Sequence, residues 1–494
     1  MNPNRSTDIQ IPELHLAPMG HTVLSKASKT FHAFPRWLWV TTLVLVAWGA
    51  TTANPILTPV AVLVPIVCGI LLWRPGEPPV LVFACAMQWL QAASVIFYVD
   101  LYGISLSQAG GPEFERATWL SLGAIVALTA GMRLALLRSG PSRYALLRNE
   151  ALRTNIGAAL AGYLSCFSIA VLAQRFAWDI PALTQVIYAL ITLKWCALFI
   201  LAYCIVEQQK GYLFLGLIAV VEVAIGLLGF FAGFKSVFFV LFVVALTSPF
   251  ALRGRRLTVT LLLAITLFCM GTVWSAIKSE YREFLNQGTD QQVVTVSVDE
   301  SAGKLGDLLS NLTWDNFMDG LDAMLLRVGY VRFFALTLIN VPDAVPYENG
   351  ALWAGAVKHV VTPRLFFPDK GTISDSERTT LYTGVLVAGE EQGTSIGIGY
   401  VAESYVDFGP IWMFAPIFLL GAFFGIIYRV FIIHARFKLI GTAIASAILI
   451  FGAYTIETSN IKIVGGNVTS VIVLGGLYLA LARILHGWLT SDAK

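Results

Sequence analysis

Two carboxylates and a tyrosine stand close together in residues 399–409, whose sequence is GYVAESYVDFG. Tyr400 comes three residues before Glu403 and Asp407 comes four residues after it, so a helix would place the two carboxylates on one face. A carboxylate held beside a hydroxyl group can orient that group or act as its general base. The alternative is structural, because the dipole at the start of a helix also favours acidic side chains.

Cationic side chains precede this segment. Arg364 stands between a proline and an apolar Leu-Phe-Phe run, a pattern typical of a loop held near a membrane surface. His359, Lys370 and Arg378 lie on either side of it in the sequence. A guanidinium group presents five donors in one plane, which suits a phosphate or a diphosphate. Each of these four side chains could instead bind a carbonyl or a carboxylate of the protein itself, or remain in water.

A second pair of arginines, Arg327 and Arg332, lies within residues 315–338. Because they are five residues apart, a helix would point them about 140° away from each other. The pair is therefore poorly placed to hold one ligand together. We expect ion pairs with acids such as Asp319 or Asp322, with contact to a substrate as the alternative.

Lys194 and Glu222 lie near the middle of two neighbouring apolar runs. Charges at membrane depth are costly and are usually paired or functional. We expect the two side chains to pair with each other. Such a pair could hold a helix bundle together, or it could mark a path for protons or substrate.

Other chemical patterns are absent from the sequence. There is no P-loop, GxGxxG, HExxH, GxSxG or EF-hand pattern. The six cysteines all fall in apolar runs and form no CxxC pair, so they predict neither a disulfide framework nor a metal site. We therefore expect no metal and no cofactor.

The composition predicts the elements that must position these residues. Of 494 residues, 57% are hydrophobic and 13% are charged, about half the charged fraction of a typical soluble domain. Mean hydropathy is +0.73. These values exclude a soluble enzyme, a disordered chain and a nucleic-acid-binding protein with a basic face. Apolar runs of roughly 20 residues predict an all-α integral membrane protein with about 12 transmembrane helices. The expected spans are 37–53, 56–73, 78–98, 118–137, 155–174, 184–206, 212–233, 236–252, 257–277, 411–432, 438–456 and 469–487.

The loop charges predict the orientation. Arginine and lysine gather after the fourth, eighth and tenth spans, which places those loops and both termini in the cytoplasm. Asn54-Pro55 separates two short runs, so 37–73 is either two spans or a re-entrant pair. The predicted organisation is a cytoplasmic segment at 1–36, about nine spans within 37–277, an outer loop at 278–410, three spans within 411–487 and a cytoplasmic tail at 488–494.

The outer loop is the natural place for function. It holds 18 of the 30 acidic residues and 9 of the 33 basic ones. It is too long for a connector, and its aromatic residues need something to pack on. Apolar side chains at helical spacing predict one amphipathic helix over 315–338. Because the loop is net acidic, any phosphate site within it must be a local one.

Many spans followed by one large late outer loop resemble the layout of Wzy-type O-antigen or exopolysaccharide repeat-unit polymerases. The stretches PRLFFPDK and GYVAESYVDFG are similar to what such proteins carry before and at the next span. The resemblance implies a metal-independent, GT-C-like glycosyltransferase at the periplasmic face of a bacterial inner membrane. Its donor and acceptor would be polyprenyl-diphosphate-linked oligosaccharides. A chain-length regulator and a repeat-unit flippase would be its partners, in a lipid bilayer and without nucleic acid.

The resemblance also implies roles for individual residues. Arg364 would contact the donor diphosphate, with Arg378 or His359 assisting. Glu403 would activate or orient the acceptor hydroxyl, and Tyr405 or Tyr400 would stack on a sugar. Three alternatives remain at this stage: an O-antigen ligase with a similar layout, a polysaccharide or lipid transporter, and a membrane assembly factor. A transporter would place its functional charges within the spans rather than in the outer loop.

Overall fold

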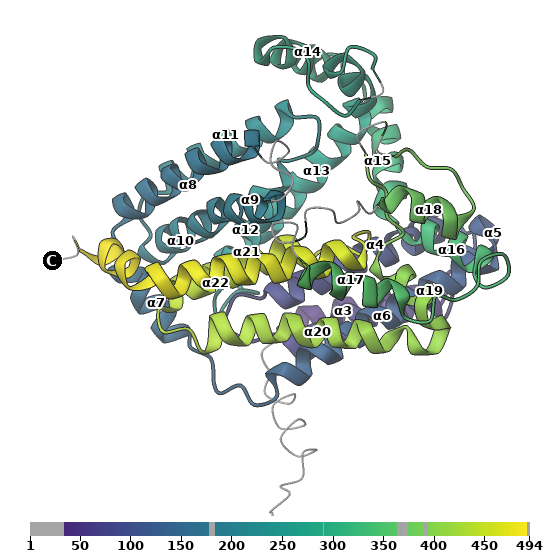
Figure 1. Cartoon of the computed structure of the whole chain (residues 1–494), viewed down its shortest axis with the longest axis horizontal. Helices are drawn as coiled ribbons and strands as arrows, with labels where there is room; N and C mark the ends of the chain where they lie inside the picture. The colour runs from purple at the N-terminus through teal and green to yellow at the C-terminus, as the bar shows by residue number, and fades with distance from the viewer. Residues whose placement is uncertain are drawn as a thin grey trace, which may run out of the picture.

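The computed structural model describes residues 34–176, 183–289, 291–362, 367, 374–389, 391 and 394–491. Every regular element in these ranges is helical, and none of them is a strand. Figure 1 shows long helices lying side by side across the molecule, with a group of shorter helices toward one end. The all-helical architecture expected from the apolar runs is confirmed for the described residues.

The helices fall into three groups along the chain. The first is α2 (Arg36–Gly49), α3 (Leu57–Leu72), α4 (Val80–Leu101), α5 (Leu106–Gly110), α6 (Pro112–Leu136), α7 (Tyr144–Arg153), α8 (Ile156–Phe176), α9 (Thr184–Ile191), α10 (Leu193–Gln208), α11 (Tyr212–Leu228), α12 (Lys235–Leu246) and α13 (Gly254–Leu285). The second is α14 (Val298–Ser310), α15 (Trp314–Val328), α16 (Val331–Asn340), α17 (Ala351–Val361), α18 (Asp375–Thr383) and α19 (Tyr400–Trp412). The third is α20 (Phe414–Tyr428), the π-turn η2 (Arg429–Ile433), α21 (Lys438–Gly452) and α22 (Asn460–Thr490).

Seven helical stretches in the described ranges are long and apolar enough to cross a membrane. They are α4, α6, α8, the consecutive α9 and α10, α13, α20 with η2, and α22. The other five expected spans correspond to the shorter apolar helices α2, α3, α11, α12 and α21. The structure thus bears out the membrane character of the chain through these long apolar helices.

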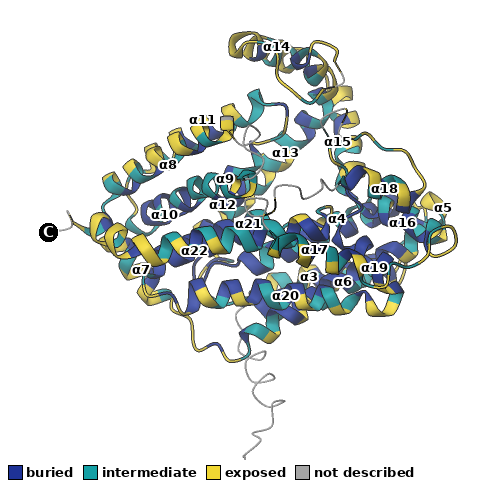
Figure 2. Ribbon diagram, viewed as in Figure 1, coloured by how far each residue is buried: buried dark blue, intermediate teal, exposed yellow. Residues whose placement is uncertain are grey.

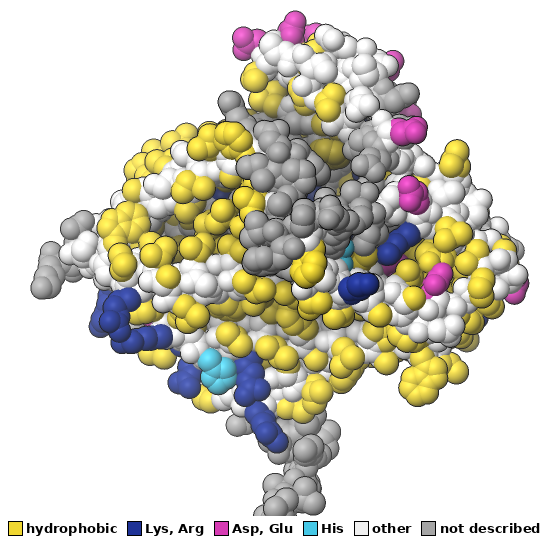
Figure 3. Space-filling view, in the orientation of Figure 1, with side chains coloured by type: hydrophobic (Ala, Val, Ile, Leu, Met, Phe, Trp, Pro, Cys, Tyr) yellow, Lys and Arg dark blue, Asp and Glu magenta, His cyan; other side chains and the backbone are white. Residues whose placement is uncertain are grey.

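Contacts between loops define one end of the molecule. Arg74 Nη2 donates to Gly140 O at 2.8 Å, and Asn155 N donates to Leu489 O at 2.8 Å. The first bond joins the ends of α3 and α6, and the second joins the end of α22 to the start of α8. Figure 3 shows Lys and Arg side chains gathered around α7 at this end and acidic side chains around α14. We call the first region the basic end; it comprises residues 74–77, 137–155, 207–212, 253–256, 434–438 and 487–491.

The central helix of the bundle is α21. Every residue from Lys438 to Ile450 is buried. By contrast, α8 and α11 expose apolar side chains along one edge (Figure 2); Leu172 is 59% exposed and Leu213 is 73% exposed. An exposed apolar edge of this kind suits contact with lipid, whereas α21 contacts only protein.

The turn that follows α21 is recessed into the bundle. Gln88, in the middle of α4, donates through Nε2 to Ala453 O at 2.7 Å. Gln91 accepts at Oε1 from Ile456 N at 2.6 Å. Backbone away from water must find its hydrogen bonds inside the protein, and these two glutamines provide them. We call residues 453–459 the recessed turn.

Glycines allow α6 and α20 to approach closely. A Cβ at Gly425 would lie 2.7 Å from Met132 O and 2.7 Å from Ala135 Cβ. A Cβ at Gly131 or Gly421 would collide with the backbone of the other helix. Gly421 and Gly425 form a GxxxG pattern, which is typical of closely packed membrane helices.

The single amphipathic helix expected over 315–338 is wrong. The structure has two helices, α15 and α16, that break at Gly329 (φ −69°, ψ 84°). Tyr330 N donates to Gln91 O at 3.1 Å, and a Cβ at Gly329 would collide with Val95. Contact with α4 therefore interrupts a pattern that is continuous in the sequence.

The expected pair of membrane-depth charges forms. Lys194 Nζ lies 2.8 Å from Glu222 Oε2, and Tyr163 donates its hydroxyl to Glu222 Oε1 at 2.5 Å. Lys194 also lies 4.2 Å from the ring centre of Trp195. The cluster joins α8, α10 and α11, and each charge within it has a partner.

Candidate functional site

Glu403 lies in the first turn of α19, where this helix passes the recessed turn. Gly399 precedes the helix with a φ of 88°, and a Cβ there would collide with the backbone of Ile456. Tyr400 N donates to Thr458 O at 2.8 Å. Because glycine alone combines this φ with such a close approach, α19 can start directly against the turn. Glu403 is buried as a result, with 1% of its surface exposed.

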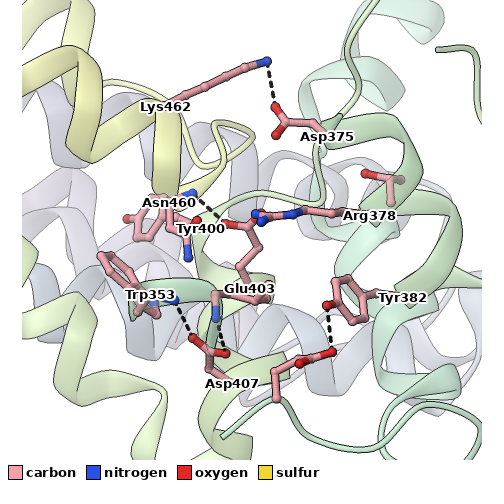
Figure 4. Close-up of polar contacts among 12 residues, drawn as sticks. Trp353, Asp375, Arg378, Tyr382, Tyr400, Glu403, Asp407, Asn460 and Lys462 are labelled. Carbon is pink, nitrogen blue, oxygen red and sulfur yellow. Dashed lines mark hydrogen bonds and ion pairs between the residues drawn. The ribbon is translucent and has the colours of Figure 1, made fainter. Parts of the chain in front are cut away.

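The Glu403 carboxylate has partners from two other helices (Figure 4). Asn460 N, in the first residue of α22, donates to Oε2 at 2.6 Å. Arg378 Nη1, from α18, lies 3.9 Å from Oε1. That distance is too long for a hydrogen bond but allows an ion pair. The carboxylate therefore sits between the positive end of a helix dipole and a guanidinium group.

Burial raises the pKa of the Glu403 carboxyl to about 8. The Asn460 N–H and the Arg378 guanidinium act in the opposite direction. The neighbouring Asp375 and Asp407 add to the increase. A carboxyl whose pKa lies near neutral pH can both accept and release a proton, which suits general acid–base catalysis.

Several buried polar atoms around Glu403 lack a hydrogen-bond partner within the described ranges. They are Asn460 Nδ2 and Oδ1, Ser459 Oγ and Arg378 Nη1. Leaving such a group unsatisfied costs on the order of 1–3 kcal/mol. Donors and acceptors that remain open around a carboxylate are suited to a ligand that carries hydroxyl groups.

A second ion pair holds the site together. Asp375, the first residue of α18, is 4% exposed, and Lys462 Nζ lies 2.7 Å from its Oδ2. Lys462 Nζ also donates to Ser395 Oγ at 2.9 Å. This bridge ties α18 to the first turn of α22 (Figure 4). It thereby fixes Arg378 and Asn460 on their respective sides of Glu403.

Asp407 has a different surrounding, although it lies one turn further along α19. It accepts from Leu352 N at 3.0 Å and from Trp353 N at 2.8 Å. These N–H groups belong to the first turn of α17, so Asp407 caps that helix from outside. Burial raises the pKa of Asp407, while the N–H groups that it accepts oppose the increase. Because both oxygens are engaged, the geometry favours the structural interpretation of Asp407 over a catalytic one.

Tyr400 and Tyr405 are packing residues of α19. Tyr400 is 0% exposed and donates to Gln88 Oε1 at 2.7 Å. Tyr405 is 1% exposed and donates to Val341 O at 3.0 Å. Neither ring presents a face on which a sugar could stack, so the stacking role expected for both is corrected to a positioning role.

The remaining candidates of the late outer loop are placed as follows. Arg364 and Lys370 lie outside the residues that the structure describes. His359 is half-buried in the last turn of α17, the helix that Asp407 caps. It therefore belongs to an element that packs beside α19 and α22.

Arg327 and Arg332 lie at the end of α15 and the start of α16, and both are exposed. In the part of the chain that the structure describes, no ion pair joins either arginine to an acid. The ion pairs expected with nearby aspartates are therefore wrong.

Several residues of the site escaped the sequence analysis: Ser459, Asn460, Lys462 and Asp375. A signal for the first two was present. The polar run ETSN at 457–460 stands directly before an apolar run, which is typical of a helix start. Likewise, the segment SDSE at 374–377 has the pattern of a helix cap. Neither pattern indicates that the two helix starts meet at Glu403.

The site can thus provide one buried carboxylate with a raised pKa, one guanidinium and several open hydrogen-bonding atoms. This set suits deprotonation of a hydroxyl group next to an anionic leaving group. Within the described ranges, no group of three or more His, Cys, Asp or Glu residues could hold a metal ion.

Comparisons with known proteins give one match. A family model described as a domain of unknown function, DUF8712, matches residues 82–456, more than half of the chain. The match includes Asp375, Arg378 and Glu403 and ends just before Ser459. No curated protein and no solved structure matches the chain.

Proposed function

This chain belongs to the DUF8712 family, and we propose that it is a Wzy-type polymerase of O-antigen or exopolysaccharide repeat units. It transfers a growing glycan from its polyprenyl diphosphate to an incoming lipid-linked unit. The reaction takes place at the periplasmic face of a bacterial inner membrane. The observation that carries the proposal is the buried Glu403, which faces Arg378 and open hydrogen-bonding atoms at the end of the molecule opposite to the basic end.

The proposed transfer needs a base and a stabilised leaving group. Glu403 accepts the proton of an acceptor hydroxyl, and that oxygen forms a bond to the anomeric carbon of the donor. The bond from this carbon to the lipid diphosphate breaks, and the diphosphate leaves with the electron pair. Arg378 lies on the side of Glu403 opposite to Asn460 (Figure 4) and supplies positive charge near the developing anion.

Asn460 positions the base. Its N–H holds Oε2 of Glu403 at 2.6 Å, which leaves Oε1 facing Arg378. The side-chain atoms of Asn460 and Ser459 are buried and lack a hydrogen-bond partner within the described ranges, so their chemistry, though not their exposure, suits sugar hydroxyl groups. The donor diphosphate is already a good leaving group, so the proposed reaction needs no metal.

The proposed membrane topology has twelve crossings in a GT-C-like arrangement with both termini in the cytoplasm. The arginines and lysines of the basic end support a cytoplasmic location for that end. Five of its six segments carry them, which is the expected pattern for short cytoplasmic loops. The recessed turn and α19 then lie on the periplasmic side of the membrane.

The experiment that tests this proposal is a gene deletion followed by sizing of the surface and secreted polysaccharide. Complementation uses wild type, Glu403→Gln, Arg378→Lys and Arg364→Ala, each checked for membrane expression. Glu377→Gln serves as the matched control, because Glu377 is exposed on α18 one residue before Arg378. We expect single repeat units without long chains in the deletion strain and in the Glu403→Gln strain.

Two other outcomes would reassign the protein. If long chains form in the deletion strain but never reach the lipid A-core, the protein is an O-antigen ligase. If Glu403→Gln complements as fully as Glu377→Gln does, Glu403 is not the base and the polymerase proposal fails.

Transport is the second candidate, and the Lys194–Glu222 pair is the observation that favours it. A transporter would lose function when Lys194→Gln removes one charge and would tolerate Glu403→Gln. A structural pair instead predicts that the exchange Lys194→Glu with Glu222→Lys restores the folded protein. Folding recovered together with polysaccharide synthesis would argue against transport through this pair.

A further inference from the structure

Three sulfur atoms meet where α3, α4 and α6 pack against one another. Cys85 Sγ of α4 lies 3.9 Å from Met132 Sδ of α6. Cys68 of α3 reaches the same place, because its Sγ lies 3.2 Å from Thr129 Oγ1 and Cys85 Sγ lies 3.4 Å from that oxygen. Thr129 and Met132 are three residues apart on α6 and therefore share a face. We call these four residues the sulfur cluster.

The sulfur cluster is buried close to the basic end. None of its four side chains is more than 2% exposed. Cys68 lies four residues before the end of α3, and Met132 lies four residues before the end of α6. Water is therefore kept away from the sulfur atoms, although the surface of the basic end is only about one helical turn away.

Sulfur ligands select soft metal ions. Thiolate and thioether groups favour Cu(I), whereas Mg²⁺ and Ca²⁺ prefer carboxylate and carbonyl oxygen. A d¹⁰ ion of the first transition row binds thiolate sulfur at about 2.3 Å, so two sulfur atoms of a trigonal site lie roughly 4 Å apart. The 3.9 Å between Cys85 Sγ and Met132 Sδ matches this spacing. Because its third ligand is a thioether, such a site needs only two residues of the set His, Cys, Asp and Glu.

Thr129 limits the charge that the sulfur cluster can carry. Its hydroxyl has one proton, so it can donate to one sulfur atom and accept from the other. This pattern suits one thiolate, at Cys85, and one thiol, at Cys68. A single negative charge in an apolar interior needs one positive charge beside it. A monovalent soft cation therefore leaves the site neutral, whereas a divalent ion leaves it charged.

We propose that Cys68, Cys85 and Met132 bind one soft monovalent metal ion, of the class of Cu(I), between α3, α4 and α6. The Cys85 thiol loses its proton to the medium, and its sulfur and the Met132 thioether form bonds to the ion. The Cys68 thiol is the third ligand. Thr129 donates to the Cys85 thiolate and thereby holds this ligand in place. The inference does not depend on the polymerase proposal, because no residue of the sulfur cluster belongs to the Glu403 site.

The test measures metal binding by the full-length protein in detergent. The probes are Cu(I), kept reduced by ascorbate and held by the colorimetric chelator bicinchoninate, and Ag(I), which needs no reductant. All proteins carry Cys269→Ser, because Cys269 is an exposed thiol that would compete. The variants are Cys85→Ser and Met132→Leu. Cys204→Ser is the matched control, since Cys204 is an equally buried cysteine on α10. Thermal melting without metal checks that each variant is folded.

We expect wild type and Cys204→Ser to take one Cu(I) from the chelator, to release about one proton per ion, and to melt at a higher temperature when the ion is bound. Loss of a residue that only supports a ligand lowers metal affinity roughly 10–100-fold, so Cys85→Ser should lower it at least about 100-fold and Met132→Leu at least about tenfold. Met132→Leu keeps the apolar volume, so its folded structure should be that of wild type.

Three results would overturn the proposal. The first is a wild type that takes no Cu(I) from the chelator. The second is binding by Cys85→Ser and Met132→Leu as tight as that of Cys204→Ser. The third is tighter binding of Zn²⁺ than of Ag(I), because it would show that the ligands do not select a soft monovalent ion. Polysaccharide sizing with Glu403→Gln reports separately on the polymerase proposal.

Discussion

Glu403 and Glu207 are both buried carboxylates beside arginine, yet they lie at opposite ends of the molecule and have unequal partners. At the basic end, Glu207 is contacted by Arg256 at 2.7 Å and by Arg148 at 3.1 Å, one on each oxygen. At the site end, Glu403 has one N–H at 2.6 Å and one guanidinium at 3.9 Å. Glu207 thus has short contacts to two cations, whereas Glu403 has no short contact to a cation.

Other carboxylates of the basic end resemble Glu207. Glu150 accepts from Lys438 N at 3.0 Å and from Leu439 N at 2.8 Å, and so caps the central helix α21. Glu77 accepts from Arg74 and from Tyr428. The comparison teaches that burial by itself does not identify a functional carboxylate. What distinguishes Glu403 is burial combined with incomplete hydrogen bonding in its surroundings.

The largest expected effect is on the reaction. Glu403→Gln removes the proposed base while keeping the shape of the side chain, and under the polymerase proposal we expect polymer growth to slow by about 10²–10⁴-fold. Purified protein supplied with lipid-linked repeat units would give this rate. Glu377→Gln should leave it unchanged. An equal loss in Glu207→Gln would mean that the two carboxylates do not differ in function.

The corresponding change at the basic end, Glu207→Gln, should lower the stability of the protein rather than the rate. Glu207→Gln leaves Arg148 and Arg256 without their carboxylate, and because both arginines are partly exposed we expect a loss of about 1–2 kcal/mol in the free energy of unfolding. Denaturant unfolding in detergent measures this loss. The rate per folded molecule should remain that of wild type. If Glu207→Gln lowers the rate and leaves the stability unchanged, the assignment of stability to Glu207 and of reactivity to Glu403 is contradicted.

The raised pKa of Glu403 predicts a difference in pH dependence. Its carboxyl titrates at about 8 in the folded protein and near 4.3 when unfolded. Between these values the folded state holds one more proton, so the contribution of Glu403 to stability falls as pH rises from about 4.3 to about 8. We expect Glu403→Gln to melt several degrees above wild type at pH 9 and close to it at pH 4.

The reaction rate should depend on the same titration of Glu403. It should rise with pH over the range in which the stability falls. The ionised form of Glu403 is the proposed base, so the rate should rise with pH up to about 8 and then level off. A flat rate profile over this range, together with equal melting curves of wild type and Glu403→Gln, would contradict the raised pKa.

The smallest expected effect concerns the second carboxylate of α19. Asp407→Asn weakens the cap of α17, because an amide can accept from only one of the two N–H groups of Leu352 and Trp353. We expect a loss of about 1 kcal/mol in stability and a modest change in rate. Asp343→Asn, at an exposed position, is the control. A rate loss as large as that of Glu403→Gln would return Asp407 to the catalytic role first considered.

The sequence alone determined the helical class, because runs of apolar residues leave no other way to satisfy the backbone in a membrane. It also singled out Glu403, Arg378 and the Lys194–Glu222 pair, since charges are rare in so apolar a chain. The break at Gly329 could not be predicted, because contact with Val95 and Gln91 of α4 causes it.

Only the tertiary structure decided which carboxylate is suited to chemistry. Glu403 and Asp407 look alike in the sequence, being acids one turn apart on the same helix. Their difference comes from segments distant in the chain: α17 brings N–H groups to Asp407, whereas Asn460 and Arg378 reach Glu403 from α22 and α18. A local pattern fixes which face of a helix a side chain occupies. What that face meets depends on packing, and packing sets the burial, the hydrogen bonds and hence the pKa.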